Sequence, residues 1–148
     1  MNVVTAFALS LAAGFAVPLQ AGTNARLGVA LGHPLLATTV SLIVSLIAVV
    51  GVMLIFKVQR PCLMALQGTP WWAWLGGIAG VFYITTALLM APRMGTLNFM
   101  MAVIVGQLII SLVIDYFGLV GLPRQPVSGQ RVIGALVVIA GFLITIRS

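Results

Sequence analysis

The chain is divided into five long apolar runs by short stretches of charged residues, prolines and glycines. A helix rises about 1.5 Å per residue, so about 20 residues cross the roughly 30 Å hydrocarbon core of a bilayer. Only 5% of the 148 residues are charged and 62% are hydrophobic, which leaves too few charges to cover a water-soluble domain. The runs are also too long and too uniformly apolar for the alternation of a β-barrel. The sequence therefore predicts an all-α integral membrane protein with one transmembrane domain, residues 1–148.

Charges, prolines and glycines also give approximate limits to the five spans. The first run carries no charge from Asn2 to Ala25 and lacks the basic segment of a cleaved signal, so we expect it to be retained. Trp71, Trp72 and Trp74 stand at the start of the third run, where an aromatic belt is expected. The predicted spans are residues 3–25, 35–56, 71–91, 96–119 and 127–146.

The positive charges divide almost evenly between the two sides of the membrane. Because the connections are short, successive spans are antiparallel, and the N-terminus shares one side with the 57–70 and 120–130 loops. Four cations against three is a weak bias that favours a cytoplasmic N-terminus and also permits insertion in both orientations. The side of the N-terminus holds Lys57, Arg60, Arg124 and Arg131, and the other side holds Arg26, Arg93 and Arg147.

Composition and motifs argue against several classes of function. The seven cations are scattered, without the basic cluster that binding to nucleic acid needs. The lone Cys62 excludes an intrachain disulfide, and the sequence contains no Cys/His spacing for a metal. There is no Ser/His/Asp set and no phosphate-binding loop, so we predict neither an enzyme nor a cofactor.

A polar stripe runs through the fourth span. Gln107, Ser111 and Asp115 recur every fourth residue, which places them along one stripe of a helix. Gln107 lies near the centre of the span, where an unsatisfied polar group costs several kcal/mol, so it must face a partner or water. Two interpretations stay open for Gln107, a contact with substrate or a hydrogen bond between helices.

Asp115, the only acidic residue of the chain, lies at the end of this stripe. It follows Gln107 by eight residues, roughly 12 Å along the helix axis, and so lies at the edge of the hydrocarbon. It could pair with one of the four cations on that side or act as a protonatable, cation-attracting gate. Arg26, at the surface after the first span, could simply extend into the interface or could attract anions.

Polar residues in the first and third spans complete the candidate site. Gln20 and Asn24 are four residues apart and share a helix face, just after Pro18. The proline should kink or loosen the helix and free backbone carbonyls for a ligand, or the two amides could cap the end of the span. Tyr83 lies near the centre of the third span, at a depth similar to that of Gln107, and its hydroxyl needs a partner. We predict Gln20, Asn24, Tyr83 and Gln107 as substrate contacts.

Small residues at helix-contact spacing predict close helix packing, within the chain or between chains. Gly76 and Gly80 form a GxxxG pattern in the third span, and Gly134 and Gly141 lie seven residues apart on one face of the fifth. The second span carries small polar residues that we also interpret as packing residues: Thr38, Ser41 and Ser45.

Motifs in all five spans carry a resemblance to a known family. They are Pro18–Ala25, His33–Leu35, Trp72–Gly80, Pro92–Gly95, Gly106–Leu108 and Asp115–Gly118. Through them the chain resembles the YdcZ-like family of short bacterial inner-membrane proteins. Its closing segment, Arg131–Gly141, is similar to the last span of the wider drug/metabolite transporter superfamily. The resemblance implies a five-helix half of an inverted-repeat transporter that pairs with a second copy or a paralogous subunit, and it implies export of a substrate that it does not identify.

Five helices are few for a complete alternating-access pathway, which usually needs two repeats. The leading hypothesis is therefore a secondary transporter that works as a dimer and exports a small organic solute, and the charge distribution permits antiparallel subunits in that dimer. The alternative is a non-transporting subunit of a larger membrane complex. Small multidrug relatives carry a membrane glutamate in the first span, and larger relatives often carry a Gly-Glu at the end of the fourth. Because the first span here has no acid, the resemblance implies no proton coupling through a first-span carboxylate.

Overall fold

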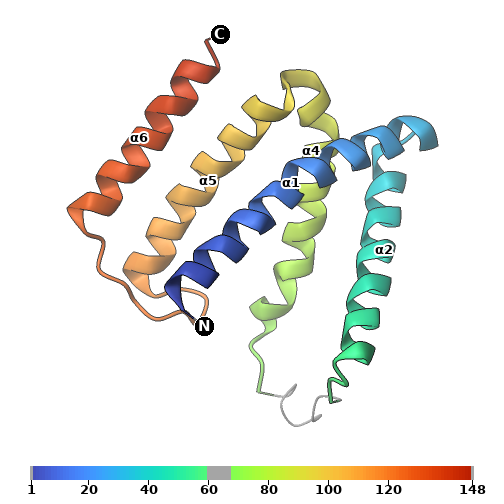
Figure 1. Cartoon of the computed structure of the whole chain (residues 1–148), viewed down its shortest axis with the longest axis horizontal. Helices are drawn as coiled ribbons and strands as arrows, with labels where there is room; N and C mark the ends of the chain where they lie inside the picture. The colour runs from blue at the N-terminus through green and yellow to red at the C-terminus, as the bar shows by residue number, and fades with distance from the viewer. Residues whose placement is uncertain (1, 60–67, 148) are drawn as a thin grey trace. The chain divides into compact units, whose positions relative to one another are not determined.

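The computed structural model describes residues 2–59 and 68–147, so Arg60 and Cys62 lie outside the described residues. Four of its helical segments are long and apolar enough to cross a membrane, and the last, of 17 residues, is a shorter apolar helix. The described part contains no strand. The predicted all-α membrane fold with five hydrophobic segments is therefore confirmed. In chain order the elements are α1 (Val3–Leu31), α2 (Pro34–Ile55), the 3-10 turn η1 (Trp71–Leu75), α4 (Gly76–Met94), α5 (Thr96–Phe117) and α6 (Gly129–Thr145) (Figure 1).

Side-chain caps and left-handed residues set the ends of several helices. Asn2 caps α1 with its side chain, and Ser128 caps α6 in the same way. α1 ends where Gly32 adopts a φ of 75°, a conformation that glycine enters without steric cost. His33 then begins α2, because its Nδ1 accepts a hydrogen bond from the backbone N–H of Leu35 at 3.2 Å. The histidine is thus the N-cap of the second helix.

Two helices continue beyond the predicted ends of their membrane spans. α1 continues beyond the predicted end at Ala25 and stops at Leu31, because Arg26 ends an apolar run without breaking the helix. α4 likewise continues through Pro92 to Met94, beyond the predicted end of the third span at residue 91. A proline in the last turn removes one backbone donor, but the few residues after it can stay helical. A change in polarity therefore does not by itself mark the end of a helix.

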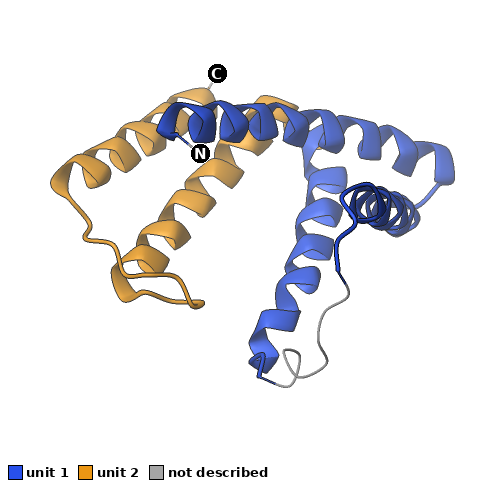
Figure 2. Cartoon of the chain, turned by 60° about the horizontal axis from the view of Figure 1, so that its bottom comes forward, with its two compact units in different colours: residues 1–92 blue, residues 93–148 orange. Residues whose placement is uncertain are grey.

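The chain divides into two compact units, residues 1–92 and 93–148, drawn in blue and orange in Figure 2. In the first unit α1 contacts α2, and α4 completes a small core around Ala37, Ile84 and Leu88. In the second unit α5 and α6 pack as an antiparallel helix pair. The assignment of residues 1–148 to one transmembrane domain stays a prediction.

Gly28 of α1 lies close to both of the other helices of the first unit. A Cβ atom placed on it would lie 3.1 Å from Leu88 Cδ2 of α4 and 3.7 Å from Ala37 Cβ of α2. The missing side chain therefore lets α1 approach both neighbours at once. Small residues have this function in membrane proteins because lipid removes the hydrophobic drive between helices and leaves close packing in its place.

The described chain buries few apolar side chains. Eight hydrophobic residues are buried, and five of them are alanines, whereas most of the large aliphatic and aromatic side chains are exposed. An apolar surface of this extent in water would be far larger than the patches found on soluble monomers. Lipid is the solvent in which such a surface is stable, so these helices contact lipid along much of their length.

Candidate functional site

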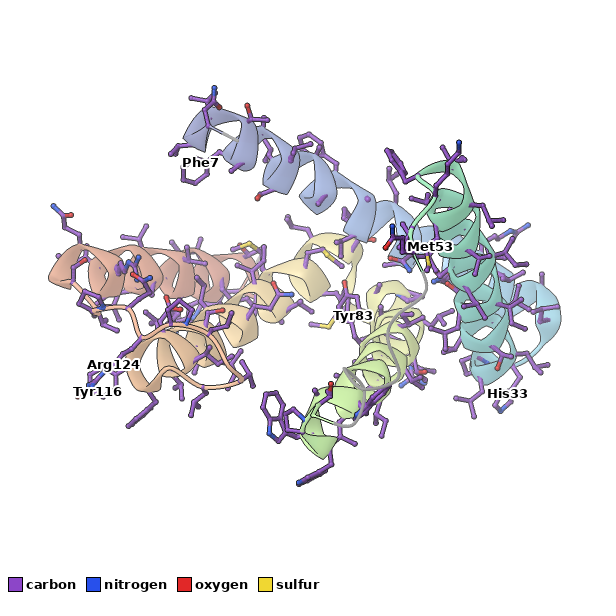
Figure 3. All side chains as sticks on the ribbon, turned by 90° about the horizontal axis from the view of Figure 1, so that it is seen from below. Phe7, His33, Met53, Tyr83, Tyr116 and Arg124 are labelled. Atoms are coloured by element: carbon purple, nitrogen blue, oxygen red, sulfur yellow. The ribbon has the colours of Figure 1, made fainter. Side chains whose placement is uncertain are left out.

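Three of the predicted substrate contacts come together in the first unit. Gln20 and Asn24 of α1 and Tyr83 of α4 line one small cavity. Helical periodicity explains the grouping, since residues three and four apart share a face. The cavity has a volume of about 10 Å³, which is space for roughly one water molecule. Figure 3 labels Tyr83 on its helix, and the hydroxyl oxygen of this tyrosine is buried. The remaining walls of the cavity are apolar: Val17, Ala21, Ile84 and Ala87.

Two hydrogen bonds between helices lie close to this cavity. The buried Asn24 donates from Nδ2 to Ser41 Oγ of α2 at 3.0 Å. The hydroxyl oxygens of Thr38 on α2 and Thr85 on α4 are 3.1 Å apart. Ser45, by contrast, donates to a backbone carbonyl of its own helix, that of Ser41, at 2.9 Å. Thr38 and Ser41, interpreted from sequence as packing residues, are thus the hydrogen-bonding residues that join α2 to its neighbours.

Gln20 is the cavity residue with an available amide. Its side chain is exposed and makes no hydrogen bond to any other residue in the described ranges. The amide of Asn24 is partly engaged through its contact with Ser41, although its carbonyl oxygen can still accept. A ligand at this cavity would therefore meet amide and hydroxyl groups and no charged side chain. Such a lining suits an uncharged polar ligand, because a buried ion needs a compensating charge.

The three polar residues of the α5 stripe do not all face the same groove. Ser111 and Asp115 line a groove of about 330 Å³ between α5 and α6, with Arg131 on the opposite wall. Gln107 is exposed and is not among the residues that line this groove. The reason is geometric: each step of four residues overshoots a full turn by about 40°, so Gln107 lies roughly 80° around the helix from Asp115. A contact of Gln107 with substrate stays a prediction.

Asp115 forms an ion pair with a neighbouring cation. Its Oδ2 accepts a hydrogen bond from Arg131 Nη1 at 3.2 Å, with the Asp115 side chain 37% exposed. The structure therefore selects Arg131 from the cations predicted to share this side of the membrane. A gating function for Asp115 stays a prediction. Arg26 is exposed on α1, and its attraction of anions likewise stays a prediction.

The glycines predicted to mediate packing have mostly open surroundings. A Cβ atom on Gly76, Gly80 or Gly134 would meet no heavy atom within 4 Å in the described structure. On Gly141 it would lie 3.8 Å from Met101 Cε of α5. Gly141 thus lies in contact distance of α5, and the part of all four glycines in helix packing or dimer formation stays a prediction. Across residues 2–59 and 68–147, no three His, Cys, Asp or Glu side chains gather as a metal site would require.

These features define an all-helical, multi-pass membrane protein with a polar cavity between two lipid-exposed helices. A protein family described as "Putative inner membrane exporter, YdcZ", within the drug/metabolite transporter group, matches residues 5–144. The chain belongs to this YdcZ family and is a multi-pass protein of the inner membrane. The resemblance inferred from its motifs is thereby confirmed. The family description, an exporter, is not that of an enzyme. No curated protein and no solved structure matches the chain.

Proposed function

We propose that this chain is one half of a secondary transporter that exports a small, uncharged polar solute, with the α1–α4 cavity as part of its pathway. The observation that carries the proposal is the meeting of Gln20, Asn24 and Tyr83 in one cavity. Intramembrane polar side chains are costly and are enriched at the pathways of transporters. The exporter description of the family supports the same conclusion.

A dimer supplies the second repeat that one chain lacks. Five helices correspond to one repeat, and alternating access usually needs two repeats around a common site. The open face at Gly76 and Gly80 is a surface on which a second chain could pack closely. Because the cations divide four to three, the second chain could insert in the opposite orientation. We therefore propose a homodimer, with antiparallel subunits as its favoured form.

Binding of solute requires movement of α1 relative to α4. A volume of about 10 Å³ holds one water molecule and no organic molecule of several heavy atoms. The solute would enter when α1 and α4 separate. The Asn24–Ser41 bond keeps α1 attached to α2 meanwhile. The proposal thus places the opening between α1 and α4. If α1 and α2 move together, the contact between Thr38 of α2 and Thr85 of α4 breaks as the cavity opens.

Transport into liposomes tests this function. The purified chain is reconstituted and screened with uncharged polar solutes, with and without a pH gradient. We expect Gln20→Ala to lower the rate of flux at least about tenfold, the loss of one or two hydrogen bonds to the solute. Gln130→Ala, at an exposed glutamine of α6, is the matched control and should transport like the wild type.

Two results would contradict the proposal in different ways. Equal flux by Gln20→Ala and wild type would remove the cavity from the pathway while leaving a transporter. Absence of flux for every solute, together with co-purification of a fixed membrane partner, would favour the non-transporting subunit.

A further inference from the structure

The chain has almost no acid with which to neutralise its own cations. It contains seven Lys and Arg residues and one acidic residue, Asp115. That carboxylate is already paired with Arg131 at 3.2 Å. Every other cation must therefore find its anion outside the side chains of this protein. For a membrane protein the nearest abundant anions are the phosphates of lipid headgroups.

Among the cations that the structure describes, Arg124 has its guanidinium over an aromatic ring. Its Cζ lies 5.3 Å from the centroid of the Tyr116 ring, and Figure 3 labels the two side chains next to each other. Tyr116 in turn packs edge-to-face against Phe117, with ring centroids 4.9 Å apart. Stacking occupies the face of a guanidinium and leaves the N–H groups at its edge free to bind an anion with two parallel hydrogen bonds.

The loop backbone brings Arg124 to this position. α5 ends at Gly118, which has a φ of 66° and turns the chain back towards the helix. The N–H of Gln125 donates to the carbonyl oxygen of Asp115 at 2.8 Å and closes the loop. A Cβ atom on Gly118 would lie 3.3 Å from both the Cβ and the backbone N of Arg124. The arginine thus approaches α5 as closely as it does because residue 118 has no side chain.

Arg124 lies in a groove that has hydrogen-bond donors and an apolar wall. It has a volume of about 450 Å³ and is lined by Tyr116, Arg124, Gln125, Pro126 and Val127. In the described ranges the side-chain amide of Gln125 makes no hydrogen bond, so it can donate to a ligand. Tyrosine at the end of an apolar helix lies at the level of lipid headgroups. The stacked guanidinium is therefore at the depth where phosphates are found.

We propose that this groove binds the phosphate of an anionic phospholipid. Arg124 would hold the phosphate oxygens with its free N–H edge, and the Gln125 amide would add a further donor. Pro126 and Val127 would contact the first carbons of the glycerol and acyl chains. The occupant would hold the end of α5 at the membrane interface, independently of whatever solute the α1–α4 cavity accepts.

Native mass spectrometry of the detergent-solubilised chain tests the site. Phosphatidylglycerol and phosphatidylcholine with identical acyl chains are titrated, and the fraction of protein that retains one lipid is measured. We expect tighter binding of phosphatidylglycerol, and about a tenfold loss of its affinity in Arg124→Gln, the effect of removing a charged hydrogen bond. Arg147→Gln makes the same change of charge at an exposed arginine of the C-terminal turn and should bind like the wild type. Equal losses in the two variants would overturn the proposal.

Substitutions at two glycines test the geometry of the loop separately from the charge of Arg124. Gly118 and Gly121 both have positive φ, 66° and 75°, but a Cβ on Gly121 meets nothing within 4 Å in the described structure. We expect Gly118→Ala to lower the affinity for phosphatidylglycerol and Gly121→Ala to preserve it, with helix content checked by circular dichroism. Equal affinities would overturn the proposed geometry. Inorganic phosphate at millimolar concentration should not displace the lipid, and displacement would assign the groove to a free anion.

Discussion

Asn24 shows how one amide can join two helices inside a membrane. Its hydrogen bond to Ser41 at 3.0 Å lies beside the polar cavity and links α1 to α2. We expect a double-mutant cycle of Asn24→Ala and Ser41→Ala to give a coupling free energy of about 0.6 kcal/mol, and at most roughly 1.7 kcal/mol. Denaturant unfolding in detergent micelles measures it. In the control cycle Ser45→Ala replaces the serine that bonds to its own helix, and that cycle should give no coupling to Asn24.

The ion pair of Asp115 contributes little to the free energy of unfolding because Asp115 is partly exposed. The pair with Arg131 is screened by solvent at the membrane edge, with the two side chains 37% and 48% exposed. We expect Asp115→Asn to change the free energy of unfolding by less than about 1 kcal/mol. Liposome flux measured across pH then tests the gate: an unchanged pH profile in Asp115→Asn would show that this carboxylate does not couple transport to protons.

At the scale of the element, α1 is the helix on which the packing of the first unit depends. It contacts both neighbours at Gly28, where a Cβ would come within 3.1 Å of Leu88 Cδ2. We expect Gly28→Leu to destabilise the chain by about 1–3 kcal/mol, because the added side chain must separate the three helices. Gly22→Leu is the matched control on the same helix, since a Cβ there meets no heavy atom within 4 Å in the described structure. Equal unfolding midpoints for the two variants in detergent would contradict this account of the packing.

At the scale of the whole molecule, the near-equal distribution of positive charge predicts two insertion orientations. We expect a C-terminal reporter to be detected on both sides of the membrane, because four cations against three is a small bias. Arg93→Gln with Arg147→Gln should leave the C-terminus outside only. Lys57→Gln with Arg60→Gln should favour the opposite orientation. A reporter found on one side in the wild type and in both double variants would rule out dual topology.

Much of the fold could be predicted from sequence because hydropathy and helix-ending residues act locally. The five apolar segments were identified from their length, and the family was identified from short motifs such as Trp72–Gly80. Boundaries were less accurate where charge and helix end differ, as at Arg26, which lies inside α1. The cavity was predicted in part: Gln20, Asn24 and Tyr83 share it, and their polarity was the signal. Gln107, predicted from its depth and from the polar stripe of the fourth span, lies in the second unit, and its contact with substrate stays a prediction.

The sequence by itself determined that this chain is a helical membrane protein with a few polar groups in its spans. Only the tertiary structure decided which of those groups meet. It paired Asn24 with Ser41, Thr38 with Thr85, and Asp115 with Arg131 from among several cations. The physical reason is that lipid-facing helices are apolar on nearly every side, so hydropathy does not distinguish the face that packs from the face that is exposed. Small residues such as Gly28 and polar pairs across helices make that choice, and these contacts join residues far apart in the chain.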